Sequence, residues 1–280
     1  MQCLLIRAKS FVSFDNFRYI YIYIYIYIYI SDAKLLPKDI LLEKLTRYAI
    51  FVGDLWEFRR DYGTKRALKL ENVNRSLHLG DEISKLLERS EEIEFGKLIS
   101  TKFVLYPSDR ESFLELKHLQ VSSSPEILYI IDSKNQWFLQ NGVFLLLESL
   151  VLDSLNNLEE IWHDLIPIGY FGNLKTLNVD SCPKLKFLLL LSMARGLSQL
   201  EEMTIEDYNA MQQIIAYERE LEIKEDGHVG TNWQLFPKLR SLKLENLPQL
   251  INFSCELETS STFLSTNARS EDSFFSHKVC

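Results

Sequence analysis

Apolar residues recur along most of the chain with one fixed spacing, 3, 2, 3, 3 and 3 residues apart. The stretch NLKTLNVDSCPKLKFL shows the six slots, which are filled by Leu174, Leu177, Val179, Cys182, Leu185 and Leu188. Copies of this pattern begin at residues 90, 116, 147, 174, 200 and 239, and a fainter copy begins near Lys65. The spacing is neither helical nor alternating throughout, so unrelated amphipathic elements do not explain it. It indicates an internal repeat.

The spacing also predicts how each copy folds. The slots of L-x-L alternate, which is typical of a short strand with its apolar side chains on one face. The later slots turn the chain back, and each copy leaves an apolar edge that only a neighbouring copy can cover. We therefore predict an α/β leucine-rich-repeat solenoid, a horseshoe with short parallel strands on the concave face and helices or irregular turns on the convex face. Helical returns are expected at 190–200 and 210–224.

Several stretches resemble a known family. They carry L-x-x-L-x-[LV]-x-x-C-P-x-L and a return to F-P/G-x-L-x-x-L, and they span residues 86–132, 147–164, 171–188 and 236–253. This pattern resembles the leucine-rich repeats of plant intracellular disease-resistance proteins of the coiled-coil, nucleotide-binding, leucine-rich-repeat type. The resemblance extends over about residues 31–255. It implies a protein-interaction module of plant innate immunity, which recognises a pathogen effector or a modified host protein through its concave face.

The chain departs from a complete receptor of that family. No stretch matches G-x-x-x-x-G-K-[ST], the loop that cradles ATP phosphates, so no cofactor is expected. Nothing corresponds to the family's N-terminal coiled-coil domain either. The sequence looks like the C-terminal fragment of a receptor or a truncated paralogue, and the nucleotide-binding domain of a fuller receptor is a further possible partner.

The N-terminal part contains YIYIYIYIYIYI, six copies of one dipeptide, from Tyr19 to Ile30. A TA dinucleotide repeat read in this frame encodes alternating tyrosine and isoleucine, so we interpret the segment as translated simple-repeat DNA; an edge strand is the alternative. The expected organisation is a non-native or disordered leader at 1–30, degenerate repeats or a cap at 31–89, leucine-rich repeats at 90–255, and a disordered tail, rich in serine, threonine and charge, at 256–280.

Composition narrows the function classes. The net charge of −8 argues against a general nucleic-acid binder, which needs a basic surface to neutralise phosphates. The four cysteines show no C-x-x-C spacing, and no signal peptide or membrane span of about 20 apolar residues is evident. A cytoplasmic protein is expected.

The sequence contains no constellation that predicts catalysis. The five histidines lie far apart, without H-E-x-x-H, and no serine sits in G-x-S-x-G. Acid pairs such as Glu159-Glu160 recur at equivalent slots and are typical of a solvated face. Cys182 occupies a core slot, where a small apolar residue is expected. We therefore expect no enzyme, no catalytic residue and no metal site.

If the protein binds a partner, the residues between the core leucines of each strand should contact it. The middle of this surface is acidic, which favours a partner with a basic patch. An adaptor that recruits substrates to a ubiquitin ligase is the alternative, because LPKDILLEKL within residues 34–62 superficially resembles the helical segment such an adaptor needs. The candidate protein-binding residues are Lys117, His118, Gln120, Glu148, Asp153, Lys175, Asn178, Asp180, Glu201, Glu202, Glu206, Asp207, Arg240, Lys243 and Glu245.

Overall fold

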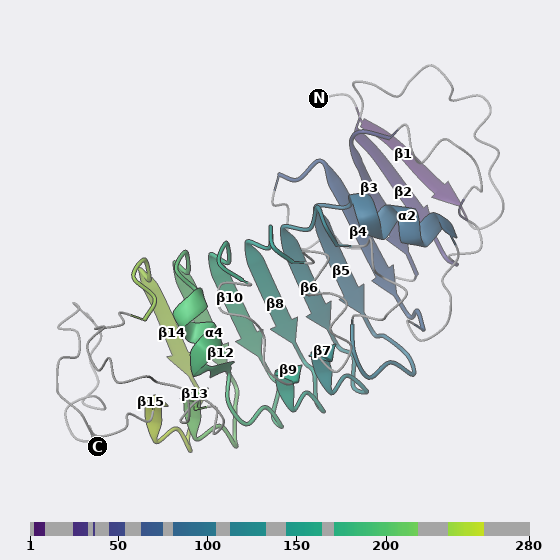
Figure 1. Cartoon of the computed structure of the whole chain (residues 1–280). Coiled ribbons are helices and arrows are strands. Elements are labelled where there is room, and N and C mark those ends of the chain that lie inside the picture. The colour runs from purple at the N-terminus through teal and green to yellow at the C-terminus, as the bar shows by residue number, and fades with distance from the viewer. Residues whose placement is uncertain are drawn as a thin grey trace.

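The computed structural model describes residues 3–8, 25–32, 36, 45–53, 63–74, 81–104, 113–132, 144–163, 171–217 and 235–254. Within these ranges, ten strands lie side by side in chain order and form one parallel sheet (Figure 1). They are β1 (Cys3–Ala8), β2 (Tyr25–Ile30), β3 (Tyr48–Val52), β4 (Arg66–Glu71), β5 (Glu92–Gly96), β6 (His118–Ser122), β8 (Ser149–Asp153), β10 (Thr176–Asp180), β12 (Glu202–Glu206) and β14 (Ser241–Glu245). The predicted leucine-rich-repeat solenoid is confirmed.

Two smaller parallel sheets lie on the return path of the repeats. One pairs β7 (Tyr129–Asp132) with β9 (Glu160–His163), and the other orders β11 (Leu189–Leu190), β13 (Gln213–Ala216) and β15 (Asn252–Ser254). The sequence predicted only helices or irregular turns on this side. A solenoid whose copies align in register brings equivalent return segments together, so these too can pair as strands.

The described helices are α2 (Asp81–Arg89) and α4 (Leu191–Gly196). The helical return predicted at 190–200 is confirmed by α4. The one predicted at 210–224 is wrong where the structure describes it, because residues 213–216 form β13; residues 218–224 lie outside the described residues. The β-branched pair Ile214 and Ile215 is fully buried between β11 and β15, and this tertiary pairing overrides the local helical pattern.

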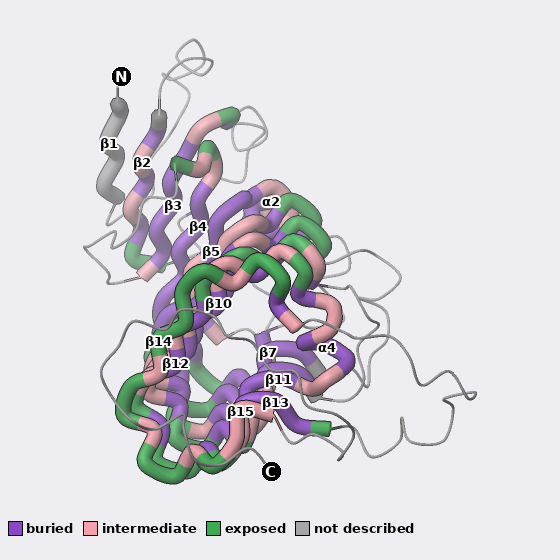
Figure 2. The backbone as a smooth tube through the Cα atoms, turned by 90° about the vertical axis from the view of Figure 1, so that its left-hand side faces the viewer, coloured by how far each residue is buried: buried purple, intermediate pink, exposed green. Residues whose placement is uncertain are grey.

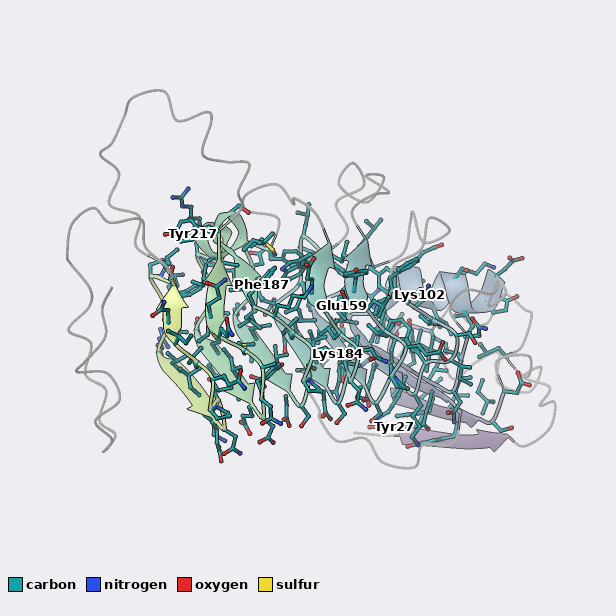
Figure 3. The ribbon with its side chains drawn as sticks, turned by 90° about the horizontal axis from the view of Figure 1, so that it is seen from below. Tyr27, Lys102, Glu159, Lys184, Phe187 and Tyr217 are labelled. Atoms are coloured by element: carbon teal, nitrogen blue, oxygen red, sulfur yellow. The ribbon has the colours of Figure 1, made fainter. Side chains whose placement is uncertain are left out.

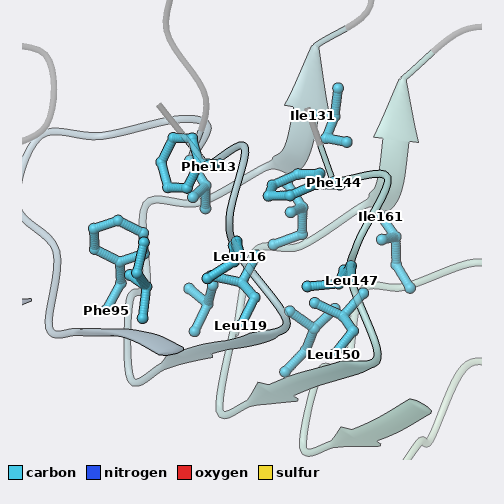
Figure 4. Close-up of a cluster of buried hydrophobic side chains, with 14 of the residues drawn as sticks. Phe95, Phe113, Leu116, Leu119, Ile131, Phe144, Leu147, Leu150 and Ile161 are labelled. Atoms are coloured by element: carbon cyan, nitrogen blue, oxygen red, sulfur yellow. The ribbon is translucent and has the colours of Figure 1, made fainter. Parts of the chain in front are cut away.

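In the copies that begin at 90 to 200, the six slots form the core between the large sheet and the return segments, whereas those of the last copy are at most partly buried (Figure 2). Leu119, Leu150, Leu177 and Met203 are aligned across neighbouring strands, and each is at most 1% exposed. Figure 4 shows part of this stack, with leucines of one copy packed on those of the next. A row of phenylalanines runs through the same copies, with centroids of Phe95, Phe113, Phe144 and Phe171 spaced 6.4, 5.7 and 6.1 Å apart.

Each strand of the large sheet from β4 onward ends in the same turn. The residue after the strand has a φ near +50° to +60° at Asn72, Lys97, Ser123, Ser154, Ser181, Asp207 and Asn246. Asparagine and aspartate tolerate this left-handed conformation better than branched residues do. The shared turn keeps the copies in register, since the amide of Ser154 donates to the carbonyl of Asp180 and that of Ser181 to Glu206.

Part of the predicted leader lies inside the sheet. Tyr25–Ile30 form β2, paired in parallel with β1 on one side and β3 on the other. Ile26, Ile28 and Ile30 enter the core, whereas Tyr27 and Tyr29 point to the opposite face. The segment is therefore a strand in this fold, and not an edge strand. Whether its coding sequence is a translated DNA repeat stays a prediction.

The other predicted segments are described in part. Residues 31–89 contribute β3, β4 and α2, which continue the stack. The tail predicted at 256–280 lies outside the described residues. Among the described helices, none is long and apolar enough to span a membrane.

Candidate protein-binding surface

The candidate residues lie on the face of the large sheet that points away from the core, here called the outer face, and at the two ends of its strands. Each of the fifteen is partly or fully exposed. The register divides them into three groups: a row that precedes the strands, a middle group on the strands, and a row that ends them.

The row at the start of the strands alternates strictly in charge, and its members precede their strands except Arg66, which begins β4. Arg66, Glu91, Lys117, Glu148, Lys175, Glu201 and Arg240 occupy equivalent positions, and we call these seven residues the charge ladder. Their adjacency is direct, because the amide of each later member donates to the carbonyl of the member before it, over 2.7 to 2.9 Å. Every interior member of the charge ladder therefore lies between two residues of opposite charge.

Four neighbouring pairs of the charge ladder are ion pairs. The shortest joins Lys175 Nζ to Glu148 Oε2 at 2.6 Å; Arg66–Glu91, Lys117–Glu91 and Arg240–Glu201 are joined at 3.3, 3.5 and 3.8 Å. Burial opposes ionisation of Glu91, but a hydrogen bond from the Lys65 amide and the charges of Lys117 and Arg66 outweigh it and lower the pKa of that carboxyl. Much of the charge in this row is therefore satisfied within the chain.

The row at the end of the strands is acidic. Asp153, Asp180, Glu206 and Glu245 are aligned on neighbouring strands, and Asp207 follows Glu206; we call these five residues the acidic strip. The hydroxyls of Ser154 and Ser181 donate to Asp153 and Asp180, each over 2.8 Å. Lys243 contacts Glu206 at 2.9 Å and Glu245 at 2.7 Å. Five carboxylates thus share this row with one ammonium group.

Burial, together with the neighbouring carboxylates, changes the titration of Asp180. Burial, and then the neighbouring charges of Asp153, Asp207 and Glu206, raise the pKa of Asp180, against the hydrogen bond from Ser181. The two carboxylates beside Lys243 raise the pKa of that ammonium. The acidic strip therefore holds repelling charges that a cation on a partner would relieve.

The middle group is mixed. Gln120, Asn178 and Lys243 are aligned with one another on the outer face. His118 and Glu202 are aligned at the opposite end of the strands from the acidic strip. Burial, with the charge of Lys117, lowers the pKa of His118 despite the opposing effect of Glu148. This group supplies polar contacts between the charge ladder and the acidic strip.

Sequence reasoning missed the N-terminal half of the outer face. There Tyr27, Tyr29 and Phe51 form an apolar cluster with Ala49 and Ala67, and the rings of Tyr29 and Phe51 stack 4.3 Å apart. Figure 3 shows the molecule from below, with Tyr27 near the purple N-terminal strands and Tyr217 toward the other end. Setting residues 1–30 aside hid this cluster.

Sequence reasoning also missed the charge ladder, although its signal is present in the sequence. The residue after the first slot of each copy alternates in sign from Glu91 to Arg240. Next to the cluster, the buried ammonium of Lys69 pairs with Glu94 at 2.6 Å on the same face, where β4 and β5 continue the rows.

The described residues offer little for catalysis. Within them, no group of three or more His, Cys, Asp or Glu side chains could hold a metal ion. Cys182 lies fully buried in its slot, and burial raises the pKa of its thiol to about 11, so the nucleophilic thiolate is disfavoured at neutral pH.

Comparison with known proteins agrees with the fold and with the resemblance. Residues 146–260 match the family model described as plant disease resistance protein RPS2-like, leucine-rich repeats. A search of curated proteins finds no match to the chain. The match covers less than half of the chain; it supports a leucine-rich-repeat region of the plant disease resistance type, and a region of this kind supports a protein-interaction role in defence.

Proposed function

We propose that the chain recognises a pathogen effector, or a host protein modified by one, through the C-terminal half of the outer face. The acidic strip carries this proposal, because its carboxylates outnumber the cations that contact them. The charge ladder is a poorer candidate, since much of its charge is already paired. The partner should present lysine or arginine along one extended segment or helix face.

The direction in which the acidic strip runs determines how a basic partner segment should lie on the sheet. The acidic strip crosses four successive strands, which lie about 4.8 Å apart, so it extends for roughly 15 Å. A basic segment that follows this row would lie across the strands. The polar side chains of Gln120, Asn178 and Glu202 would then contact the neighbouring part of the partner.

Neutralising the acidic strip tests the proposal. The variant Asp153→Asn, Asp180→Asn, Asp207→Asn and Glu245→Gln keeps side-chain size and spares the Glu206–Lys243 pair, although it removes the Glu245–Lys243 one. We expect it to weaken binding of an oligolysine peptide by tenfold or more, about 1.4 kcal/mol, in fluorescence anisotropy at low salt. Binding of an effector that triggers a defence response should weaken in parallel.

A matched control removes the same number of acids elsewhere. The variant Glu115→Gln, Glu126→Gln, Glu159→Gln and Glu160→Gln alters net charge equally, and these side chains lie outside the acidic strip. Equal losses in both variants would mean that only net charge matters, and the proposal would then be wrong. Reversing Glu201, Glu202, Glu206 and Asp207 together is a harsher test, but it also breaks the pairs with Arg240 and Lys243.

The ubiquitin-ligase adaptor is less well supported. The stretch on which it depends, LPKDILLEKL, lies almost wholly outside the described residues, and Tyr48–Val52, which follow it, form β3 among the N-terminal strands.

A further inference from the structure

Two neighbouring turns that lead into the large sheet expose leucines. The turns are 113–116, before β6, and 144–147, before β8. The phenylalanines that begin them are buried, with ring centroids 5.7 Å apart, so the two turns lie side by side (Figure 4). The next residues are exposed to water: Leu114, Leu145 and Leu146 are 40%, 46% and 42% exposed. We call these three residues the leucine patch.

The repeat does not need the leucine patch for its core. The three leucines lie outside the six slots, and the same positions hold Gly172 and Asn173 in the next copy and Ser198 and Gln199 in the one after it. The side-chain amide of Asn173 donates to the carbonyl of Leu145 over 2.7 Å, so the polar copies follow the patch directly. Apolar side chains that gather on a surface without serving the fold mark a contact site.

The leucine patch borders the charge ladder. The two turns are followed at once by the ladder members Lys117 and Glu148. Arg66 contacts Glu115 of the first turn at 3.7 Å, and the same guanidinium nitrogen contacts Glu91 of the ladder at 3.3 Å. The leucine patch and the charge ladder therefore share one surface, here called the starting rim, where the strands begin. The acidic strip lies at the other end of the strands, so the starting rim is a separate surface.

An alternating row of charges is complementary to a second copy of itself when the order is reversed. A two-fold axis that runs across the row brings one starting rim onto another, reverses the order of the repeats and keeps one ladder opposite the other. If this axis passes between two neighbouring members, every member meets one of opposite charge. If it passes through a member, every member meets one of like charge.

The leucine patch selects one of the complementary registers. It spans the copies of Lys117 and Glu148, so the axis that brings two patches together passes between these two members. In that register Lys117 meets the partner's Glu148, and Glu91 meets the partner's Lys175. The position of the leucines and the alternation of the charges are separate features of the sequence, and they agree on one arrangement.

We propose that the starting rim is a homodimer interface, in which a second copy of this chain covers the leucine patch. Burial of the two leucine patches supplies the attraction. The charges set the register, because exposed ion pairs contribute little affinity. The side chains of Lys117 and Glu148 are 39% and 35% exposed, so each can meet a further opposite charge. A different protein would have to present both leucines and alternating charges, which this chain already carries. The interface does not depend on the proposed function.

Exchanging the two central charges tests the register. In a dimer of Lys117→Glu, two carboxylates face each other on both sides of the axis, and in a dimer of Glu148→Lys two ammonium groups do so. Each variant alone should raise the dissociation constant of the dimer about tenfold at low salt, because two facing pairs change from attraction to repulsion. An equimolar mixture of the two variants should regain the native affinity, since every facing pair is then opposite in charge.

The measurement is sedimentation velocity of the full chain, with one variant of each mixture fluorescently labelled and circular dichroism to confirm folding. A mixture of Lys175→Glu with Glu148→Lys is the matched control. In the proposed register two facing pairs of that mixture still repel, so it should bind no more tightly than either variant alone.

The leucine patch is tested separately. The variant Leu145→Ser with Leu146→Ser should abolish self-association, because it removes most of the apolar surface at the axis. Ile99→Ser is the control, since Ile99 is 47% exposed but lies in the turn that follows β5, away from the starting rim. It should leave the dimer unchanged.

A native chain that stays monomeric at every soluble concentration would overturn the proposal, whether another part of the chain or a different protein covers the leucine patch. A dimer that withstands the leucine substitutions would overturn it too. So would a dimer that the mixture of Lys117→Glu and Glu148→Lys does not restore. Restoration by that mixture, and not by the control mixture, supports it.

Discussion

The repeats at 174–188 and 239–253 carry the same leucine pattern but differ in burial. In the first, Leu174, Leu177 and Leu185 are fully buried; in the second, Leu242 is exposed and the other slots are only partly buried. Both form a strand of equal length in the same sheet, with the same turn after it. Among the residues that the structure describes, the first has neighbouring strands on both sides and the second has one.

This comparison shows that burial belongs to the stack rather than to the single repeat. The leucine pattern specifies which side chains point inward, but the apolar surface leaves water only when a second strand covers it. Equivalent substitutions in the two repeats should therefore differ in cost, and each prediction below uses this difference.

The largest difference is expected from the leucine in the second slot. Leu177→Ala should lower the free energy of unfolding by about 3 kcal/mol, because it leaves a cavity in a closed core. Leu242→Ala should cost less than about 1 kcal/mol, since its side chain still contacts water. Urea unfolding of both variants, monitored by circular dichroism, checks this. Equal costs would show that the edge of β14 is covered in solution.

The next contrast comes from the fourth slot, which is occupied in one repeat by Cys182 with its titratable thiol. Cys182 has a pKa raised to about 11 by burial, so the thiol form stabilises the fold fully below the unfolded pKa of about 8.5. This contribution is lost as pH rises toward 11, by up to about 2 kcal/mol. Cys182→Ala should remove that part of the alkaline destabilisation in pH-dependent urea unfolding.

Leu247 occupies the same slot in the last repeat and is only partly buried. With the other cysteines replaced by serine, Leu247→Cys should react with a thiol reagent much faster than Cys182 does. Similar rates at the two positions would contradict the assigned difference in burial.

The charge ladder supplies a smaller contrast. Lys175→Glu places a carboxylate between Glu148 and Glu201, and should cost about 1 kcal/mol at low salt. Arg240→Glu meets only Glu201 and should cost about half as much. Both costs should shrink in 1 M salt, where the Debye length falls to about 3 Å. A cost that persists in salt would point to lost packing of the lysine stem instead.

The repeat region could be predicted from the sequence because one pattern recurs with fixed spacing. Ile93 and Leu152 were correctly predicted to be core residues, because the L-x-L alternation and the stacking of the copies require these side chains to point inward. The strand at 213–216 could not be predicted, because its pairing with β11 and β15 joins residues that are distant in sequence. The place of Tyr25–Ile30 was missed for a different reason: a low-complexity origin does not prevent alternating Tyr and Ile from forming a strand.

The candidate surface was predictable only as a set of outward positions. The sequence identifies which residues lie between core leucines, but not which of them pair with each other. The structure shows that Lys175 is engaged by Glu148 at 2.6 Å, whereas Asp180 is crowded by other acids. Such differences depend on which side chains meet across neighbouring strands.

Substitutions in the acidic strip should change the free energy of unfolding least, and the direction of that change follows from the pKa of Asp180. Because the folded state raises the pKa of Asp180, the folded chain binds that proton more tightly than the unfolded chain, whose value is about 3.9. This stability is present at low pH and is lost as pH rises through the folded pKa, so Asp180→Asn should stabilise the protein by about 0.5 kcal/mol at pH 7 and by nothing near pH 3. At the last strand, Glu245 is paired with Lys243 at 2.7 Å, and Glu245→Gln should bring no gain. Urea midpoints of both variants at the two pH values test this, and a gain from Glu245→Gln equal to that from Asp180→Asn would show that the carboxylates repel one another evenly along the whole row.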